Sequence, residues 1–156
     1  MVFKKPHDSI KPSYIALVLV AFYSLTSCVK NTLIQTEEEF SVEAQKWKSF
    51  GFSDYDYTLE NICFCPIEYI KPKRISVRNN KVVSISNNTE DVFTVTSFMT
   101  IDGFFEFIED KRKQNPVVEK IEYDPEYGFP TYIYFDISEM IADEEIGYIL
   151  TNFISY

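Results

Sequence analysis

The chain has 156 residues, of which 46% are hydrophobic and 17% aromatic, and its formal net charge is −9. This length allows one domain with a sizeable core, and the composition is that of a folded protein rather than a disordered one. Because a negative surface repels phosphate, the charge argues against nucleic acid as a partner and against electrostatic attraction to an anionic lipid surface.

The first 27 residues have the pattern of a bacterial lipoprotein signal peptide. Basic residues precede an apolar run over 15–25, which is too short to span a bilayer core. The run ends in Leu25-Thr26-Ser27-Cys28, which resembles a lipobox: an aliphatic residue, two small residues and a cysteine. We therefore expect cleavage before Cys28 and acylation of Cys28, which anchors the chain to a lipid bilayer; an ordinary secretory signal is the alternative.

Processing at this position divides the chain into a signal peptide (1–27), a tether (28–35) and one domain (36–156). The location that we expect is the cell envelope. The residue after the cysteine is Val29 rather than an aspartate, which favours the outer membrane if the organism is Gram-negative.

Two segments have the period of amphipathic helices. The segment 36–50 begins with a candidate capping box at Thr36 and carries Trp47 on its apolar face. The segment 100–113 begins with Thr100 as a candidate N-cap and has apolar residues at i, i+3, i+4 and i+7.

Four other segments have features of strands or hairpins: 54–65, 72–87, 121–136 and 147–153. In the second, Asn79 and Asn80 suit a two-residue turn, but that turn pairs Val77 with Val82 and puts Ile85 on the wrong face, so the register stays open. In the third, both faces of 131–135 are apolar or aromatic, which predicts partial cover on both sides. In the last, alternation puts Phe153 on the side opposite Tyr148 and Leu150.

The order of these elements is α-β-β-β-α-β-β-β. It predicts an α+β fold, with an antiparallel sheet of about five to six strands and two helices packed on one face.

The turn of the hairpin 121–136 carries candidate ligands for a cation. Asp124 and Glu126 lie in the turn, and Asp136 ends the second strand. The alternative is ordinary turn chemistry, in which Asp124 bonds to the backbone, Pro125 presets its φ angle and the other carboxylates are solvated. No calcium-loop spacing is present.

Most catalytic chemistry is excluded by composition. The one histidine, His7, lies in the predicted signal peptide, which removes histidine-dependent nucleophilic catalysis and imidazole metal sites from the mature chain. Four scattered glycines leave no phosphate-binding loop. We therefore expect no enzymatic activity, no catalytic residues, no cofactor and no metal site.

The cysteine pair Cys63 and Cys65 is the remaining candidate for redox or metal chemistry, and three interpretations stay open. The cysteines are structural, bridged or not; they form a redox-active disulfide, because a bridge between i and i+2 closes a tight ring; or they bind a soft metal such as Cu(I), with Met99 or Met140 as a further ligand.

A family resemblance covers about 43–153. It is carried by Trp47, by Tyr55-Asp56-Tyr57, by Cys63-Phe64-Cys65-Pro66 with Tyr69, and by Tyr123-Asp124-Pro125-Glu126-Tyr127-Gly128-Phe129-Pro130. In these motifs the chain resembles the family of bacterial exported proteins and lipoproteins labelled domain of unknown function 6174. The resemblance implies the fold and the exported location, and it implies no activity.

The function that we expect is a non-enzymatic binding or interaction module of the envelope, with an unknown envelope protein or ligand as its partner. A periplasmic thiol-redox or copper-handling protein that uses Cys63 and Cys65 is the alternative.

Overall fold

The computed structural model describes residues 27–86, 93–141 and 143–156, with side chains from residue 37 onward in these ranges. The predicted signal segment 1–26 lies outside the described residues. The chain divides into two compact units, Met1–Ser41 and Val42–Tyr156.

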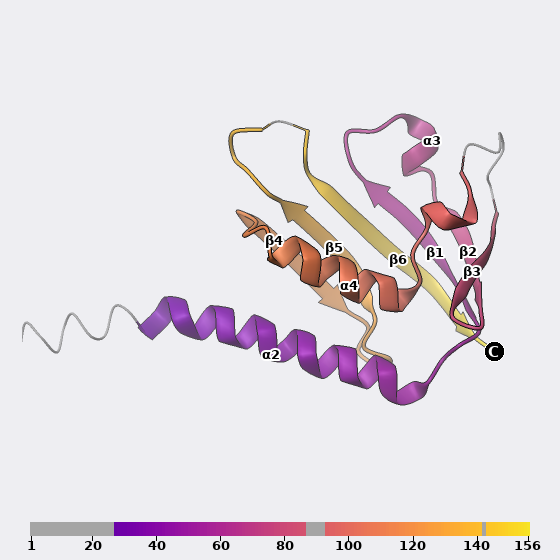
Figure 1. Ribbon diagram of the computed structural model, residues 1–156, viewed down its shortest axis with the longest axis horizontal. Coiled ribbons are helices and arrows are strands. Elements are labelled where there is room, and N and C mark those ends of the chain that lie inside the picture. The colour runs from indigo at the N-terminus through magenta and orange to yellow at the C-terminus, as the bar shows by residue number, and fades with distance from the viewer. Residues whose placement is uncertain (1–26, 87–92, 142) are drawn as a thin grey trace, which may run out of the picture. The chain divides into compact units, whose positions relative to one another are not determined.

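The second unit contains one antiparallel six-stranded sheet with the strand order β3-β2-β1-β6-β5-β4 (Figure 1). The predicted α+β fold is therefore confirmed. The elements in chain order are α2 (Ser27–Phe50), β1 (Tyr55–Ile62), α3 (Ile67–Ile70), β2 (Lys73–Arg78), β3 (Lys81–Ile85), η1 (Val95–Ser97), α4 (Ile101–Arg112), β4 (Val118–Tyr123), β5 (Pro130–Asp136) and β6 (Ile146–Ser155).

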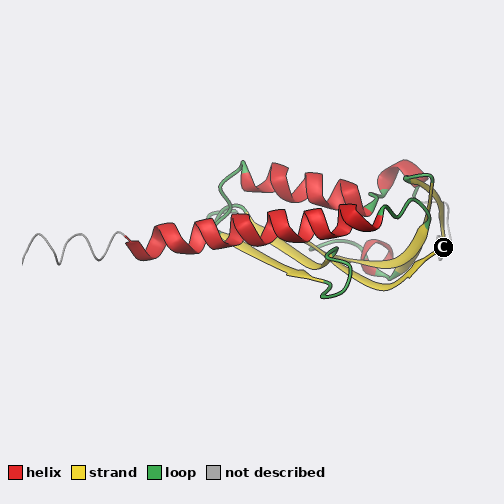
Figure 2. Cartoon of the chain, turned by 90° about the horizontal axis from the view of Figure 1, so that it is seen from below, coloured by secondary structure: helices red, strands yellow, loops and turns green. Residues whose placement is uncertain are grey.

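One face of the sheet carries the core. The helix α4 lies on this face (Figure 2), and Trp47 of α2 reaches the same face, where its ring meets Tyr55 edge-on at 5.5 Å. On β5, Ile133 and Phe135 are buried on the helix side, whereas Tyr132 and Tyr134 are half-buried on the other side. The alternation of β5 thus gives one fully covered face and one partly exposed aromatic face.

The first helix begins earlier than the pattern predicted. It starts at Ser27 rather than at Thr36, so the segment 28–35, predicted as a tether, is helical. This segment contains no proline or glycine that would stop a helix, and its lack of an apolar period did not prevent helix formation. The predicted capping box at Thr36 is accordingly wrong, because Thr36 lies inside the helix.

A bulge resolves the register of the β2–β3 hairpin. Asn79 and Asn80 both adopt positive φ, 49° and 58°, and form the two-residue turn. Val77 pairs with Val82, but the register shifts at the next step, so that Ile75 pairs with Ile85. The extra residue on β3 puts Ile85 on the same face of the sheet as Ile75, which strict alternation does not.

A register shift between β1 and β6 changes the face that Phe153 occupies, so the face predicted for this residue of the last strand is wrong. The pairing of β1 with β6 shifts between Asp56 and Thr58, and Asn152 on β6 has φ 52°. Phe153 therefore turns to the helix-covered face, where its ring contacts Trp47 at 5.6 Å. Tyr148 lies on that same face, against Phe104 of α4.

Three aromatic side chains tie the start of α4 to the rest of the domain. The backbone N–H of Ile101 donates to the Tyr55 hydroxyl at 2.9 Å, and the Tyr57 hydroxyl donates to the carbonyl of Met99. Trp47 Nε1 donates to Asp102 Oδ1 at 3.1 Å. Burial raises the pKa of both tyrosines, that of Tyr55 to about 12. The bond from Ile101 and the N-cap of Thr100 satisfy backbone N–H groups that a helix N-terminus leaves unpaired.

Asp56 lies between these two tyrosines and points to the opposite face of the sheet. Its carboxylate accepts from Arg78 Nη1 at 2.9 Å, from Arg74 Nε at 3.2 Å and from the Tyr156 hydroxyl at 3.2 Å. Burial raises the pKa of Asp56, but the hydrogen bonds, led by that from Arg78, outweigh it and lower the pKa overall. This cluster fixes β2 and the C-terminus against β1.

Candidate functional site

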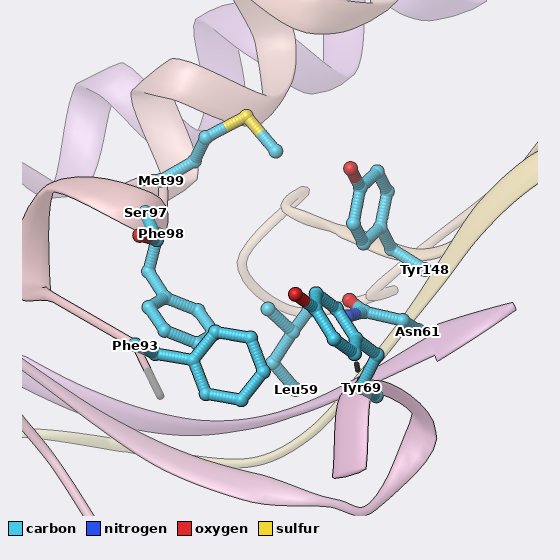
Figure 3. A pocket seen from close by; sticks show the side chains of 8 residues that line it. All are labelled: Leu59, Asn61, Tyr69, Phe93, Ser97, Phe98, Met99 and Tyr148. Carbon is cyan, nitrogen blue, oxygen red and sulfur yellow. Dashed lines mark hydrogen bonds between the residues drawn. The ribbon is translucent and has the colours of Figure 1, made fainter. Parts of the chain in front are cut away.

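A pocket of about 240 Å³ lies at the end of the helix-covered face where β1 ends and β6 begins (Figure 3). Residues from the sheet, from α3 and from the segment around η1 enclose it. They are Leu59, Asn61, Tyr69, Phe93, Ser97, Phe98, Met99 and Tyr148.

The sheet supplies one wall. Asn61 of β1 pairs directly with Tyr148 of β6, and Leu59 pairs with Leu150 two residues further along. Successive side chains of a strand alternate between faces, so Leu59 and Asn61 share the helix-covered face. Tyr148 packs against Phe104 and Phe107 of α4, at 5.1 Å and 5.3 Å between ring centroids. The wall is therefore held by the core of the domain.

The single turn of α3 supplies a second wall through Tyr69. Lys73, which is 2% exposed, holds this turn: its ammonium donates to the carbonyls of Glu68 at 2.6 Å, Lys71 at 2.9 Å and Tyr69 at 3.3 Å. Burial lowers the pKa of Lys73. Asn61 Nδ2 adds a bond to the Tyr69 carbonyl at 2.9 Å. The three ammonium protons of Lys73 are thus directed at the backbone and not at the pocket.

The segment before α4 supplies the third wall. Phe93 meets Tyr69 edge-on at 4.9 Å and Phe98 edge-on at 5.6 Å, and the Lys73 ammonium lies 4.7 Å from the centroid of the Phe93 ring. Met99 is fixed through its carbonyl, which accepts from Tyr57. In Figure 3 its thioether points across the pocket toward Tyr148.

The polar side chains of this space are hydroxyls and one amide, and none of the eight lining side chains is charged. The hydroxyls of Tyr69 and Tyr148 have no hydrogen-bond partner among the described residues, and burial raises the pKa of Tyr148. Asn61 Oδ1 is buried and lacks a partner, because the amide nitrogen is turned to the Tyr69 carbonyl. The eight lining side chains include no nucleophile–base pair.

The link between β1 and α3 carries the cysteine pair. Cys63 and Cys65 are joined by a disulfide, with their Cα atoms 5.3 Å apart, and both are half-buried. Phe64 between them is 84% exposed, and Pro66 is the N-cap of α3. The bridge therefore closes the link that leads from Asn61 to Tyr69. In this bridged state neither sulfur is a thiolate ligand for a metal ion.

The candidate acidic site does not assemble. Asp124 Oδ1 accepts from the backbone N–H groups of Glu126 at 2.9 Å and Tyr127 at 2.7 Å, which is the turn chemistry given above as the alternative. Asp136 pairs with Val118 at the opposite end of the β4–β5 hairpin, far from the turn. Nor does any group of three potential ligands among the described residues form a metal site.

Cys28, the predicted lipidation residue, lies in the first turn of α2, and its side chain is outside the described part of the chain. Among the helices that the structure describes, none is long and apolar enough to cross a membrane.

Sequence reasoning missed most of the pocket. Met99 was named as a possible metal ligand and Tyr69 as part of a motif, but Asn61, Phe93 and Tyr148 were not singled out. The one available signal was the Cys63-to-Tyr69 motif, which begins two residues after Asn61. The aromatic residues of the other walls look like ordinary core residues in sequence.

These features define a small α+β domain with an uncharged, aromatic-lined pocket beside a disulfide-closed link. A family model described as "Family of unknown function (DUF6174)" matches residues 39–155. The chain belongs to this family, as its motifs predicted. No curated protein and no solved structure matches the chain.

Proposed function

We propose that the chain is a lipid-anchored protein of the cell envelope whose folded domain is a non-enzymatic ligand-binding module. The observation that carries the binding role is the pocket of about 240 Å³, whose walls are held by the core, by Lys73 and by the N-terminus of α4. A preformed concavity lined by aromatic side chains, with a few polar groups that fix orientation, is a common form of small-molecule site.

The binding role is tested by native mass spectrometry of the protein isolated from its own envelope. We expect a small molecule to leave with the intact protein. Ser97 is exposed and lines the pocket, so Ser97→Trp should fill the entrance without disturbing the core and should remove the bound species. Ser84→Trp, at an exposed residue of β3 away from the pocket, is the matched control and should retain it. A species retained equally by both variants would place the ligand elsewhere.

The anchor rests on Cys28 and on the apolar segment that precedes it. We expect radiolabelled palmitate to enter the protein and most of the protein to sediment with membranes, because several acyl chains anchor stably where one does not. Cys28→Ala should abolish both. A labelled or membrane-bound Cys28→Ala protein would refute lipidation at this residue. If the organism is Gram-negative, the outer-membrane fraction should contain the wild-type protein.

A thiol-redox role for Cys63 and Cys65 is the second candidate, because the bridge lies on a half-buried link rather than in the core. In such a step an external dithiol gives two electrons and two protons to the bridge; Cys63 and Cys65 become thiols and the donor becomes a disulfide. Alkylation and intact mass after equilibration in glutathione buffers measure this. Full resistance of the bridge would exclude the role, and metal analysis of the reduced protein tests copper binding.

A further inference from the structure

We propose that the pocket takes a small uncharged molecule with one flat ring and one hydroxyl or amide group, which the hydroxyls of Tyr69 and Tyr148 recognise. This inference rests on the binding role proposed above and specifies the class of ligand.

The size of the pocket sets the first limit. A dry cavity of about 150 Å³ holds one benzene molecule. A volume of about 240 Å³ therefore has room for one ring and a short substituent, or for two fused rings.

The lining sets the second limit, which is the charge of the ligand. Taking an ion out of water is costly unless a counter-charge meets it, and none of the eight lining side chains is charged. The neighbouring cation is Lys73, whose ammonium already donates hydrogen bonds to three backbone carbonyls, so it has no N–H group left to donate to an anion. A cationic ligand on the aromatic rings would lie close to this same ammonium, which already covers Phe93. Both signs of charge are therefore disfavoured.

The polar groups set the third limit. The hydroxyls of Tyr69 and Tyr148 come from two different walls and have no partner among the described residues. Each hydroxyl both donates and accepts, so they suit a ligand hydroxyl or amide. The remaining polar groups are few: the Ser97 hydroxyl lies 3.2 Å from the Thr94 hydroxyl, and the Asn61 amide nitrogen donates to the Tyr69 carbonyl, which leaves Asn61 Oδ1 as one further acceptor. This supply fits one polar group and is too small for a sugar with many hydroxyls.

The methionines of the chain provide a direct readout. Met99 lines the pocket, whereas Met140 is 93% exposed on another loop. With ¹³C-methyl methionine in the full chain, held in phosphatidylcholine nanodiscs, an aromatic ligand that enters the pocket should shift the Met99 methyl resonance and leave that of Met140 in place. The probes are phenol, toluene, benzoate, benzylammonium and glucose, each at a measured free concentration.

We expect phenol to shift the Met99 resonance saturably, toluene to do so more weakly, and the two ions and glucose to bind at least tenfold more weakly than phenol. Tyr148→Phe should weaken phenol about fivefold, the value of one hydrogen bond, and leave toluene within twofold. Tyr132→Phe, the same change on the other face of the sheet, should affect neither.

Stronger binding of benzoate, benzylammonium or glucose than of phenol would overturn the inference about the ligand and leave the binding role intact. The absence of any saturable shift at Met99 would overturn both, while lipidation at Cys28 would still stand on its own labelling experiment. An equal effect of Tyr148→Phe on phenol and toluene would refute recognition through that hydroxyl.

Discussion

The turn between β4 and β5 packs against α2 so closely that only glycine fits at one position, which gives a quantitative prediction. Gly128 has φ +80°, and a Cβ atom there would lie 2.6 Å from the carbonyl oxygen of Glu43. Gly51, at the end of α2, has a similar φ of +65°, but a Cβ atom there would meet nothing within 4 Å. Alanine at the two positions therefore separates the steric contact from the backbone conformation.

Both substitutions carry the cost of a non-glycine residue in the left-handed region, about 1 kcal/mol each. Both also reduce the entropy of the unfolded chain in the same way, so this term cancels between them. Gly128→Ala additionally forces the turn or the helix to move by several tenths of an ångström, and overpacking of this kind costs about 1–3 kcal/mol. The difference between the variants should be about 1–3 kcal/mol.

Urea unfolding followed by far-UV circular dichroism measures this difference. With a slope of about 2 kcal/mol per molar, the Gly128→Ala midpoint should lie about 0.5–1.5 M below that of Gly51→Ala. The slopes must agree for the comparison to hold. Equal midpoints would mean that the turn does not pack on the helix at Glu43, and the placement of the β4–β5 hairpin against α2 would be wrong.

Three other predictions concern the β1 side chains. Tyr57→Phe leaves the Met99 carbonyl unpaired and should lower the free energy of unfolding by about 1–3 kcal/mol, whereas Tyr132→Phe should change it by less than about 0.5 kcal/mol in the same urea titration. Burial raises the pKa of Tyr55 to about 12, so as the pH rises the Tyr55 hydroxyl loses its proton in the unfolded chain before it does so in the folded protein. The free energy of unfolding should therefore fall between about pH 10 and 12, by up to about 3 kcal/mol from this residue. Tyr55→Phe should make this fall shallower. The pKa of Asp56 is lowered, so its stabilising effect is present at neutral pH and is lost as the pH falls below about 4; Asp56→Asn should be less stable at pH 7 and should show a shallower loss in acid. An acid profile unchanged by Asp56→Asn would contradict the assigned hydrogen bonds.

Much of the fold was predictable because local signals agreed with the global arrangement. The N-cap of Thr100 and the two-asparagine turn at Asn79 both act as their sequence context predicts. The errors in the strands have a common cause. Bulges insert one residue into a strand, and a strict period of two cannot anticipate which partner strand will require the shift. This is why the register around Ile85 stayed open and Phe153 was assigned to the wrong face.

The site was less predictable than the fold because its residues have no shared local pattern. Asn61 and Tyr148 are 87 residues apart in sequence and become neighbours only through the pairing of β1 with β6. Tyr69 reaches the pocket because a single turn, α3, is held by Lys73, and one turn of helix leaves no period in the sequence. The polar groups that define the ligand class are recognisable only once their hydrogen-bond partners, or the lack of them, are known.

The motifs that identify the family map mainly onto the scaffold. The pair Tyr55 and Tyr57 holds α4, and the turn around Gly128 packs on α2; only the Cys63-to-Tyr69 motif borders the pocket. The segment 93–98 contributes a whole wall yet belongs to none of these motifs. We therefore expect this wall to set the choice among neutral ligands. Phe98→Leu, at a half-buried position, should change the order in which phenol, toluene and indole shift the Met99 methyl group while the Met140 signal stays fixed. An unchanged order would assign the choice to the sheet and α3 instead.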